Sequence, residues 1–112
     1  MEYIAPELIN NDDYGKEIDI WMLGILLYEL AHCFSPFRPK KQYFVEKEMI
    51  ENIKNHEIIF YVPCSDEYKE LVSDLLESDV EKRLTIDDIY NSKLVKKYEK
   101  EQLYINDNKD NY

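Results

Sequence analysis

Few residues of this chain have the types and spacing that could do chemistry. The two cysteines, Cys33 and Cys64, have neither metal-ligand spacing nor the density of a disulfide framework. The only glycines are Gly15 and Gly24, so no glycine-rich loop is present to cradle a phosphate. The chemical groups that remain are charged side chains, with 24 Asp and Glu against 14 Lys and Arg. Because the cysteines lack metal-ligand spacing, we predict no metal site.

The composition narrows the classes of partner. A chain of 112 residues makes at most one domain, and its net charge of -10 argues against nucleic acid and anionic membrane surfaces, which need a basic face. A basic protein or peptide fits better, although the acidity could equally serve solubility alone. The low cysteine content and the lack of a secretory signal favour an intracellular setting, cytoplasmic or nuclear.

One stretch dominates the hydrophobic pattern. Residues 18–30, IDIWMLGILLYEL, are apolar around nearly the whole circumference of a helix but too few to span a bilayer. We predict a central helix over residues 16–31, buried on all sides, in which Gly24 marks the close approach of another backbone. The rest of the chain is short and mostly polar, which indicates a part of something larger.

The remaining sequence predicts further helices and no repeat. Short or amphipathic patterns predict helices near residues 5–9, 43–56, 66–76, 85–90 and 93–101, with Ser65 and Thr85 as N-caps. Residues 58–62 are expected to be extended. Residues 99–112 are polar, and we expect them to form a disordered tail. The predicted class is mainly α.

An ordered set of short motifs carries a family resemblance. The set comprises Ala5-Pro6-Glu7, the D-x-W-x-x-G pattern from Asp19 to Gly24, LYEL, Pro36-Phe37, and LLxxDxxxR from Leu75 to Arg83. Over residues 1–98 the chain resembles the C-terminal part of a eukaryotic protein kinase domain. The resemblance implies the helical part of the large lobe, arranged around one buried central helix.

The resemblance assigns structural roles to several residues. Glu7 and Arg83 would form a buried ion pair; without the resemblance both would be taken for ordinary surface charges. Asp19 would accept hydrogen bonds from the catalytic loop. The core-helix positions, of which the last two would support the hydrophobic column or simply pack the core, are Trp21, Gly24, Leu26 and Leu30.

The resemblance also suggests a substrate class. Tyr3 stands where serine/threonine kinases have Tyr, and Glu2, Tyr3 and Glu29 match an acidic pocket for a substrate arginine in Aurora-like and cyclic-nucleotide-dependent kinases. The implied preference is for basic residues near the Ser or Thr. Glu29 could instead be a structural carboxylate near a helix end. The helix at residues 43–56 matches one that often contacts docking partners.

The catalytic residues of the family are missing from this sequence. A complete kinase would use ATP and Mg²⁺, yet the chain has no HRD or DFG string, so we predict that it neither binds ATP alone nor transfers phosphate. The first interpretation is a piece of a longer serine/threonine kinase, such as a truncated gene product. The alternatives are a free-standing, non-catalytic binding module and an unrelated helical domain. Cys33 departs from the family by replacing a common Gly.

Overall fold

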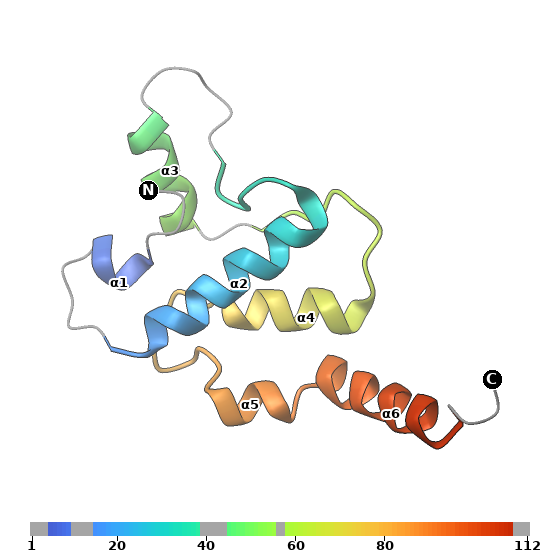
Figure 1. Ribbon diagram of the computed structural model, residues 1–112. Helices are drawn as coiled ribbons and strands as arrows, with labels where there is room; N and C mark the ends of the chain where they lie inside the picture. Colours follow the sequence, from blue (N-terminus) through green and yellow to red (C-terminus); the bar gives the residue numbers. More distant parts are fainter. Residues whose placement is uncertain (1–4, 10–14, 39–44, 56–57, 109–112) are drawn as a thin grey trace.

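The computed structural model describes residues 5–9, 15–38, 45–55 and 58–108, which contain helices and no strand. This confirms the predicted mainly helical class. In Figure 1 the helix α2 lies at the centre with α4 beside it, α1 and α3 at one end, and α5 and α6 beyond α4. The helices are α1 (Pro6–Ile9), α2 (Glu17–His32), α3 (Val45–Asn55), α4 (Asp66–Leu75), α5 (Ile86–Tyr90) and α6 (Lys93–Asn108).

The glycine within α2 allows α4 to approach closely. A Cβ atom at Gly24 would lie 2.8 Å from Leu76 Cδ2 and 3.0 Å from Leu75 Cβ, distances that leave no room for a side chain. A close approach at Gly24 is present, but the nearest atoms belong to the side chains of Leu75 and Leu76 and not, as predicted, to another backbone. The Gly in this helix therefore sets how near its axis can come to α4.

The main core forms around the aromatic side of α2. Trp21 is fully buried, and its ring stacks on that of Phe37, with centroids 5.4 Å apart. The buried members of this cluster are Ala5, Trp21, Ile25, Tyr28, Phe37, Met49, Ile53, Val72 and Leu76. A second cluster joins Ile20 to Leu71 and Leu75 of α4. Both clusters draw on α2, which is why the other elements collect around it.

The expectation that α2 is buried on all sides is wrong for one face. Met22, Leu26 and Leu30 are 42%, 51% and 71% exposed, and their spacing of four places them in one stripe along the helix. We call these three residues the apolar row. Among the described residues no element covers this stripe, because α4 packs on another face of α2, and Met49 and Ile53 of α3 belong to the core cluster of Trp21 and Ile25.

Cys33 ends α2 in a left-handed conformation. Its φ angle is 64°, and its backbone N–H donates to the Glu29 carbonyl oxygen at 2.7 Å, as expected at a helix C-cap. Glycine adopts this conformation without steric cost, whereas a residue with a Cβ is strained in it. Cys33 therefore occupies a backbone conformation that a Gly would adopt without this steric cost.

The two predicted N-caps are confirmed. The Ser65 hydroxyl accepts from the Tyr68 N–H at 3.2 Å at the start of α4. Thr85 and Asp88 form a reciprocal capping box at the start of α5, where the Asp88 carboxylate accepts from the Thr85 N–H at 2.9 Å. These hydrogen bonds, first from the backbone and then from the hydroxyl of Thr85, lower the pKa of Asp88.

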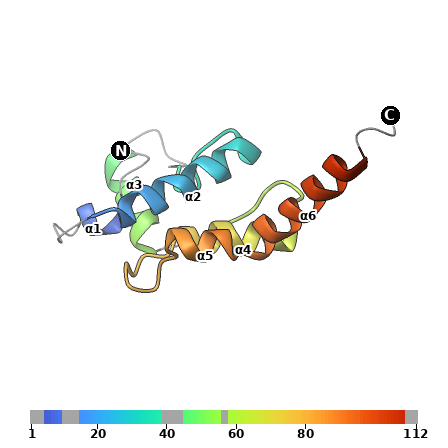
Figure 2. The ribbon, with the colours of Figure 1, turned by 60° about the horizontal axis from the view of Figure 1, so that its bottom comes forward.

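The disorder expected from residue 99 onward is wrong up to residue 108. The helix α6 continues to Asn108, and Figure 2 shows its C-terminal half extending away from the other helices. The interval contains neither Gly nor Pro, and its Lys, Glu, Gln and Leu residues have a high helix propensity. Residues 109–112 lie outside the described ranges.

Candidate functional site

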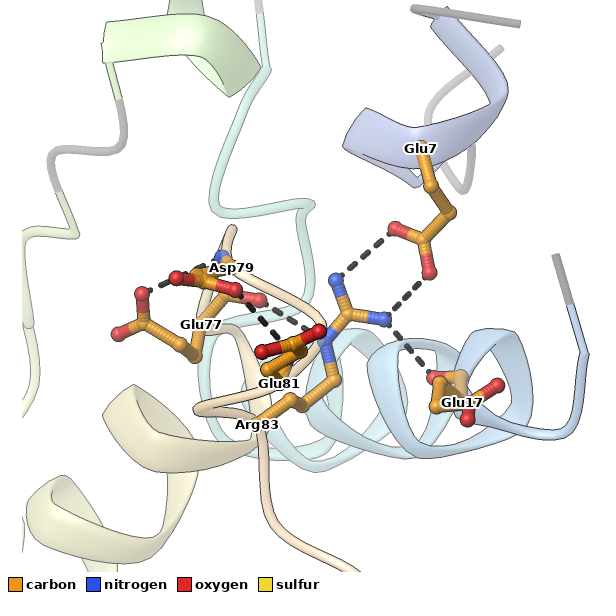
Figure 3. A network of polar contacts seen from close by, with 6 residues as sticks. All are labelled: Glu7, Glu17, Glu77, Asp79, Glu81 and Arg83. Carbon is orange, nitrogen blue, oxygen red and sulfur yellow. Dashed lines mark hydrogen bonds and ion pairs between the residues drawn. The ribbon is translucent and has the colours of Figure 1, made fainter. Parts of the chain in front are cut away.

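A buried ion pair joins residues that lie 76 positions apart. Glu7 in α1 and Arg83 in the turn after α4 form two parallel hydrogen bonds, of 2.7 Å to Oε2 and 2.9 Å to Oε1 (Figure 3). The exposed fractions of the two residues are only 3% and 4%. This bidentate geometry is the strongest form of carboxylate–guanidinium contact. The ion pair thus connects α1 to the turn after α4.

Arg83 has further partners that use its remaining donors. Its Nε donates to the Glu77 carbonyl oxygen at 2.8 Å, and Nη1 also donates to the Glu17 carbonyl oxygen at 2.9 Å. Its guanidinium carbon lies 5.2 Å from the ring centroid of Trp21. One side chain therefore links α1, the start of α2 and the end of α4.

A tight turn holds Arg83 in position. The N–H groups of Lys82 and Arg83 each donate at 3.0 Å to the Asp79 carbonyl oxygen, and the Glu81 N–H donates at 3.1 Å to Asp79 Oδ1. The Asp79 N–H in turn donates to Glu77 Oε1 at 3.3 Å, as Figure 3 shows. Local hydrogen bonds of Asp and Glu therefore form the turn that aims the arginine at Glu7.

The charge on Glu7 is stabilised despite its burial. Burial opposes ionisation and would raise the pKa, but the hydrogen bond from Arg83, backbone hydrogen bonding and the charge of Arg83 together outweigh it. The pKa of Glu7 is consequently lowered. Glu7 is therefore ionised at neutral pH, as its ion pair with Arg83 requires.

Three of the residues singled out from the sequence meet at one open cavity. Leu26, Glu29 and Leu30 line a space of about 620 Å³ beside the C-terminal half of α2. Glu29 is partly exposed and is the acidic residue of this lining. Cys33, Phe34, Ser35 and Arg38 complete the lining. The arrangement offers both a negative and a positive side chain to a ligand.

Other predicted site residues are not brought to this cavity. Asp19 lies exposed in the first turn of α2, beside a different cavity of about 780 Å³, and no described residue bonds its carboxylate. Trp21 is buried in the main core, and Gly24 is buried against Leu75 and Leu76 at the end of α4. Glu2 and Tyr3 lie outside the described residues, so the acidic pocket is represented here by Glu29 alone.

The helix at residues 43–56 is present as α3, and it is anchored on one side. Met49 and Ile53 are buried, whereas Lys47, Glu51 and Lys54 are exposed. This is the half-exposed amphipathic pattern expected from the sequence. Residues 43, 44 and 56 lie outside the described ranges.

Sequence reasoning missed an aromatic cluster at the end of α2. The His32 ring stacks on Tyr28 at 3.9 Å between centroids, Nε2 accepts from the Tyr61 N–H at 3.1 Å, and Nδ1 lies 3.1 Å from the Tyr28 carbonyl oxygen. The Tyr28 hydroxyl donates to the Ile59 carbonyl oxygen at 2.6 Å. A signal existed in the i, i+4 spacing of Tyr28 and His32 together with the aromatic run Phe60-Tyr61.

The same cluster fixes the chain between α3 and α4. Tyr68 of α4 donates its hydroxyl hydrogen to the Leu27 carbonyl oxygen at 2.5 Å, which closes this side of α2. Burial is the main cause that raises the pKa values of Tyr28 and Tyr68 to about 12. Both phenols therefore remain protonated donors throughout the physiological range.

Neither a metal-ligand cluster nor a membrane-crossing helix is found among the described residues. Within residues 5–9, 15–38, 45–55 and 58–108, no three His, Cys, Asp or Glu side chains are grouped so that they could hold a metal ion. Of the helices in these ranges, none combines the length and apolar content that a bilayer crossing requires. Both cysteines are free thiols.

Comparisons with known proteins agree on one family. Residues 1–95 match the protein kinase domain. The chain is 36% identical over 98 residues to Aurora kinase of Dictyostelium discoideum, covering 88% of this chain and 24% of that protein. It is 37% identical over 91 residues to calcium/calmodulin-dependent protein kinase type I of Schizosaccharomyces pombe, covering 78% and 26%.

A solved structure shares the fold. The twitchin kinase region from C. elegans superposes with a TM-score of 0.73 and 26% sequence identity, covering 84% of this chain and 17% of that one. The chain thus spans about a quarter of the length of the curated relatives described above, and less of this structure.

Proposed function

Since the chain belongs to the protein kinase family, we propose that it forms part of a protein serine/threonine kinase, which transfers the γ-phosphate of ATP to Ser or Thr of proteins. Residues 1–98 would supply scaffold and substrate-binding elements. The observation that carries this proposal is the family match over the same residues that form the Glu7–Arg83 pair and the α2 core.

The nucleotide chemistry is assigned to other parts of the complete kinase. Protein kinases use ATP and Mg²⁺, but the described residues contain no cluster of metal ligands and the sequence has no glycine-rich loop. The residues present therefore do not fit an ATP–Mg²⁺ site. Titrating the purified chain with ATP and Mg²⁺ tests this part, and saturable magnesium-dependent binding would contradict it.

The finer proposal is a preference for substrates with basic residues near the phosphorylated Ser or Thr. Its support is that the partly exposed residue Glu29 lines a cavity of about 620 Å³, and a carboxylate can form charge-assisted hydrogen bonds with a guanidinium. Glu2 and Tyr3 are included in this proposal on the resemblance. Asp19 is proposed as the anchor of the catalytic loop on the same ground, supported by its exposed carboxylate at the start of α2.

The first experiment is an intact-mass measurement of the endogenous protein, captured with an antibody against residues 82–98. We expect a mass far above 13.6 kDa, with the catalytic elements in the additional sequence. A mass equal to that of this chain would contradict the kinase proposal. It would favour a non-catalytic binding module that uses a surface such as α3.

Substrate preference is then measured on the complete kinase with peptide pairs that carry Arg or Gln upstream of the Ser. We expect Glu29→Gln to reduce the kcat/KM ratio for the Arg peptide over the Gln peptide by about tenfold, since a charge-assisted hydrogen bond is lost. Glu51→Gln, an equal charge change on exposed α3, should leave the ratio unchanged. An unchanged ratio in Glu29→Gln would contradict the basic-directed proposal.

We also propose an intracellular setting, cytoplasmic or nuclear, on the basis of the two free thiols. The endogenous kinase should therefore be recovered from cytosol or nuclei.

A further inference from the structure

A second, smaller cavity lies beside the first and has a different chemical character. It has a volume of about 150 Å³ and is lined chiefly by Phe34, Arg38, Asn52, Asn55, Ile59 and Tyr61. We call it the Arg38 pocket. Among the described residues that line it, Arg38 alone carries a charge. A chain with a net charge of -10 therefore has a pocket of positive sign.

Arg38 combines an aromatic contact with the donor set that suits a carboxylate. Its guanidinium carbon lies 4.2 Å from the centroid of the Phe34 ring, over the face of that ring. The planar fork of N–H groups of an arginine matches the two oxygens of a carboxylate. The described residues contain no carboxylate in an ion pair with Arg38, which is itself exposed.

The walls of the Arg38 pocket are fixed by hydrogen bonds. Asn52 of α3 donates through Nδ2 to the Phe37 carbonyl oxygen at 3.3 Å, which ties this helix to the loop that carries Arg38. On the other side, the hydroxyl of Tyr28 bonds the Ile59 carbonyl oxygen and His32 accepts from the Tyr61 N–H. A pocket with fixed walls costs a ligand less ordering free energy than a flexible surface.

An apolar surface adjoins the cation. Ile59 is 43% exposed and Tyr61 is 59% exposed, although both belong to a segment held against the core. Exposed apolar side chains beside a polar group are typical of protein–protein contact sites. The ligand therefore needs an apolar group next to its negative charge, which an acidic side chain beside an aromatic one in a polypeptide supplies.

We propose that the Arg38 pocket is a docking site for a polypeptide segment in which Glu or Asp stands beside an aromatic or large apolar residue. The acidic side chain pairs with Arg38, and the apolar side chain contacts Ile59 and Tyr61. This site goes beyond the substrate preference proposed for Glu29. Phe34, Ser35 and Arg38 line both cavities, but Glu29 does not line the Arg38 pocket and the proposal does not use it.

The test uses three seven-residue peptides that carry one Phe flanked by Glu, Gln or Lys. Each is titrated into the full 112-residue chain, with dissociation constants taken from two-dimensional NMR shifts of the Asn52 side-chain amide and the Tyr61 backbone amide. We expect the Glu peptide to bind about three- to fivefold more tightly than the Gln peptide, as is usual for an exposed ion pair, and the Lys peptide to bind most weakly.

Variants separate the pocket from general charge effects. Arg38→Gln should remove the preference for Glu, and Arg38→Lys should reduce it because lysine lacks the planar fork. Lys97→Gln makes the same change in net charge on exposed α6 and should keep the preference. Equal binding of the Glu and Gln peptides, or the absence of binding, would overturn the proposal. It would also be overturned by a preference that persists in Arg38→Gln or disappears in Lys97→Gln.

Discussion

Two regions around α2 show opposite relations between polarity and burial. Around its start, the charged side chains Glu7 and Arg83 are almost completely sealed from solvent. Along another face, the apolar row of Met22, Leu26 and Leu30 is open to it. The charged corner is closed because α1 and the turn after α4 supply both partners of the pair, whereas no described element lies over the row. Burial in this chain thus follows the elements available to cover each face more than the hydrophobicity of the residues.

The largest effect should come from removing one partner of the sealed pair. Arg83→Met leaves the Glu7 carboxylate buried without its cation, which typically costs about 3–5 kcal/mol. Urea unfolding followed by circular dichroism measures this loss. Lys93→Gln, which breaks an exposed pair with Glu70 at 3.7 Å, should cost less than about 1 kcal/mol.

The double variant Glu7→Leu with Arg83→Met sharpens this result. Replacing both charges by apolar groups avoids the uncompensated carboxylate, so we expect the double variant to recover much of the stability lost in Arg83→Met. If Arg83→Met cost no more than Lys93→Gln, the corner would not be sealed as described.

The contribution of the buried Glu7–Arg83 pair to the free energy of unfolding should also depend on pH. The pKa of Glu7 is lowered in the folded state, so its stabilising contribution is complete above its unfolded pKa of about 4.3 and is lost as pH falls through the lower folded value. Asp88 acts in the same direction, while the pKa of Asp74, raised by burial and by Glu70 and Glu77, acts in the opposite one.

Comparison with Glu7→Gln isolates the contribution of Glu7. We expect the difference in free energy of unfolding between the native chain and Glu7→Gln to be constant from pH 7 to about pH 5 and to narrow at lower pH. A difference that stayed constant down to pH 2 would contradict ionisation of Glu7 as the source of its contribution.

Local patterns in the sequence were sufficient to predict most of the helices, whereas contacts between distant segments were not. Ser65 and Thr85 start helices because a hydroxyl reaches an N–H only three residues away, which sequence alone displays. The pairing of Glu7 with Arg83 spans 76 residues and was expected only through the family resemblance.

Two errors have different physical causes, one in the tertiary surroundings and one in the weight given to local propensity. The apolar row has the composition of a buried face, and its exposure depends on which elements surround α2. Residues 99–108 have the polar composition of a tail, yet their helix propensity is sufficient to form the end of α6. The Arg38 pocket also escaped prediction, because Arg38 and Asn52 meet through the tertiary fold.

A smaller effect is expected where α2 meets α4. Gly24→Ala gains about 1 kcal/mol of helix propensity, but the new methyl group would lie 2.8 Å from Leu76 side-chain atoms, and overpacking costs about 1–3 kcal/mol. We expect a net loss of about 1 kcal/mol in urea unfolding. Gly15→Ala is the control, since among the described residues its Cβ would meet only the flexible Glu17 carboxylate at 3.0 Å. A stabilised Gly24→Ala chain would show that α4 moves aside readily.

The smallest effect on stability should come from the open face. Leu26→Gln and Leu30→Gln replace side chains that are already 51% and 71% exposed, so each should change the free energy of unfolding by no more than about 0.5 kcal/mol. Self-association of the chain, measured by sedimentation velocity, should nevertheless decrease, because an exposed apolar stripe favours association.

The buried neighbour Ile25 provides the control for the open face. It is fully buried one position away from Leu26, so Ile25→Ala should cost about 2–5 kcal/mol. If Leu26→Gln were as damaging as Ile25→Ala, the apolar row would be covered in solution. Ile25 and Leu26 would then differ less in burial than the structure requires. The contrast between the buried Glu7–Arg83 pair and the exposed apolar row would not hold.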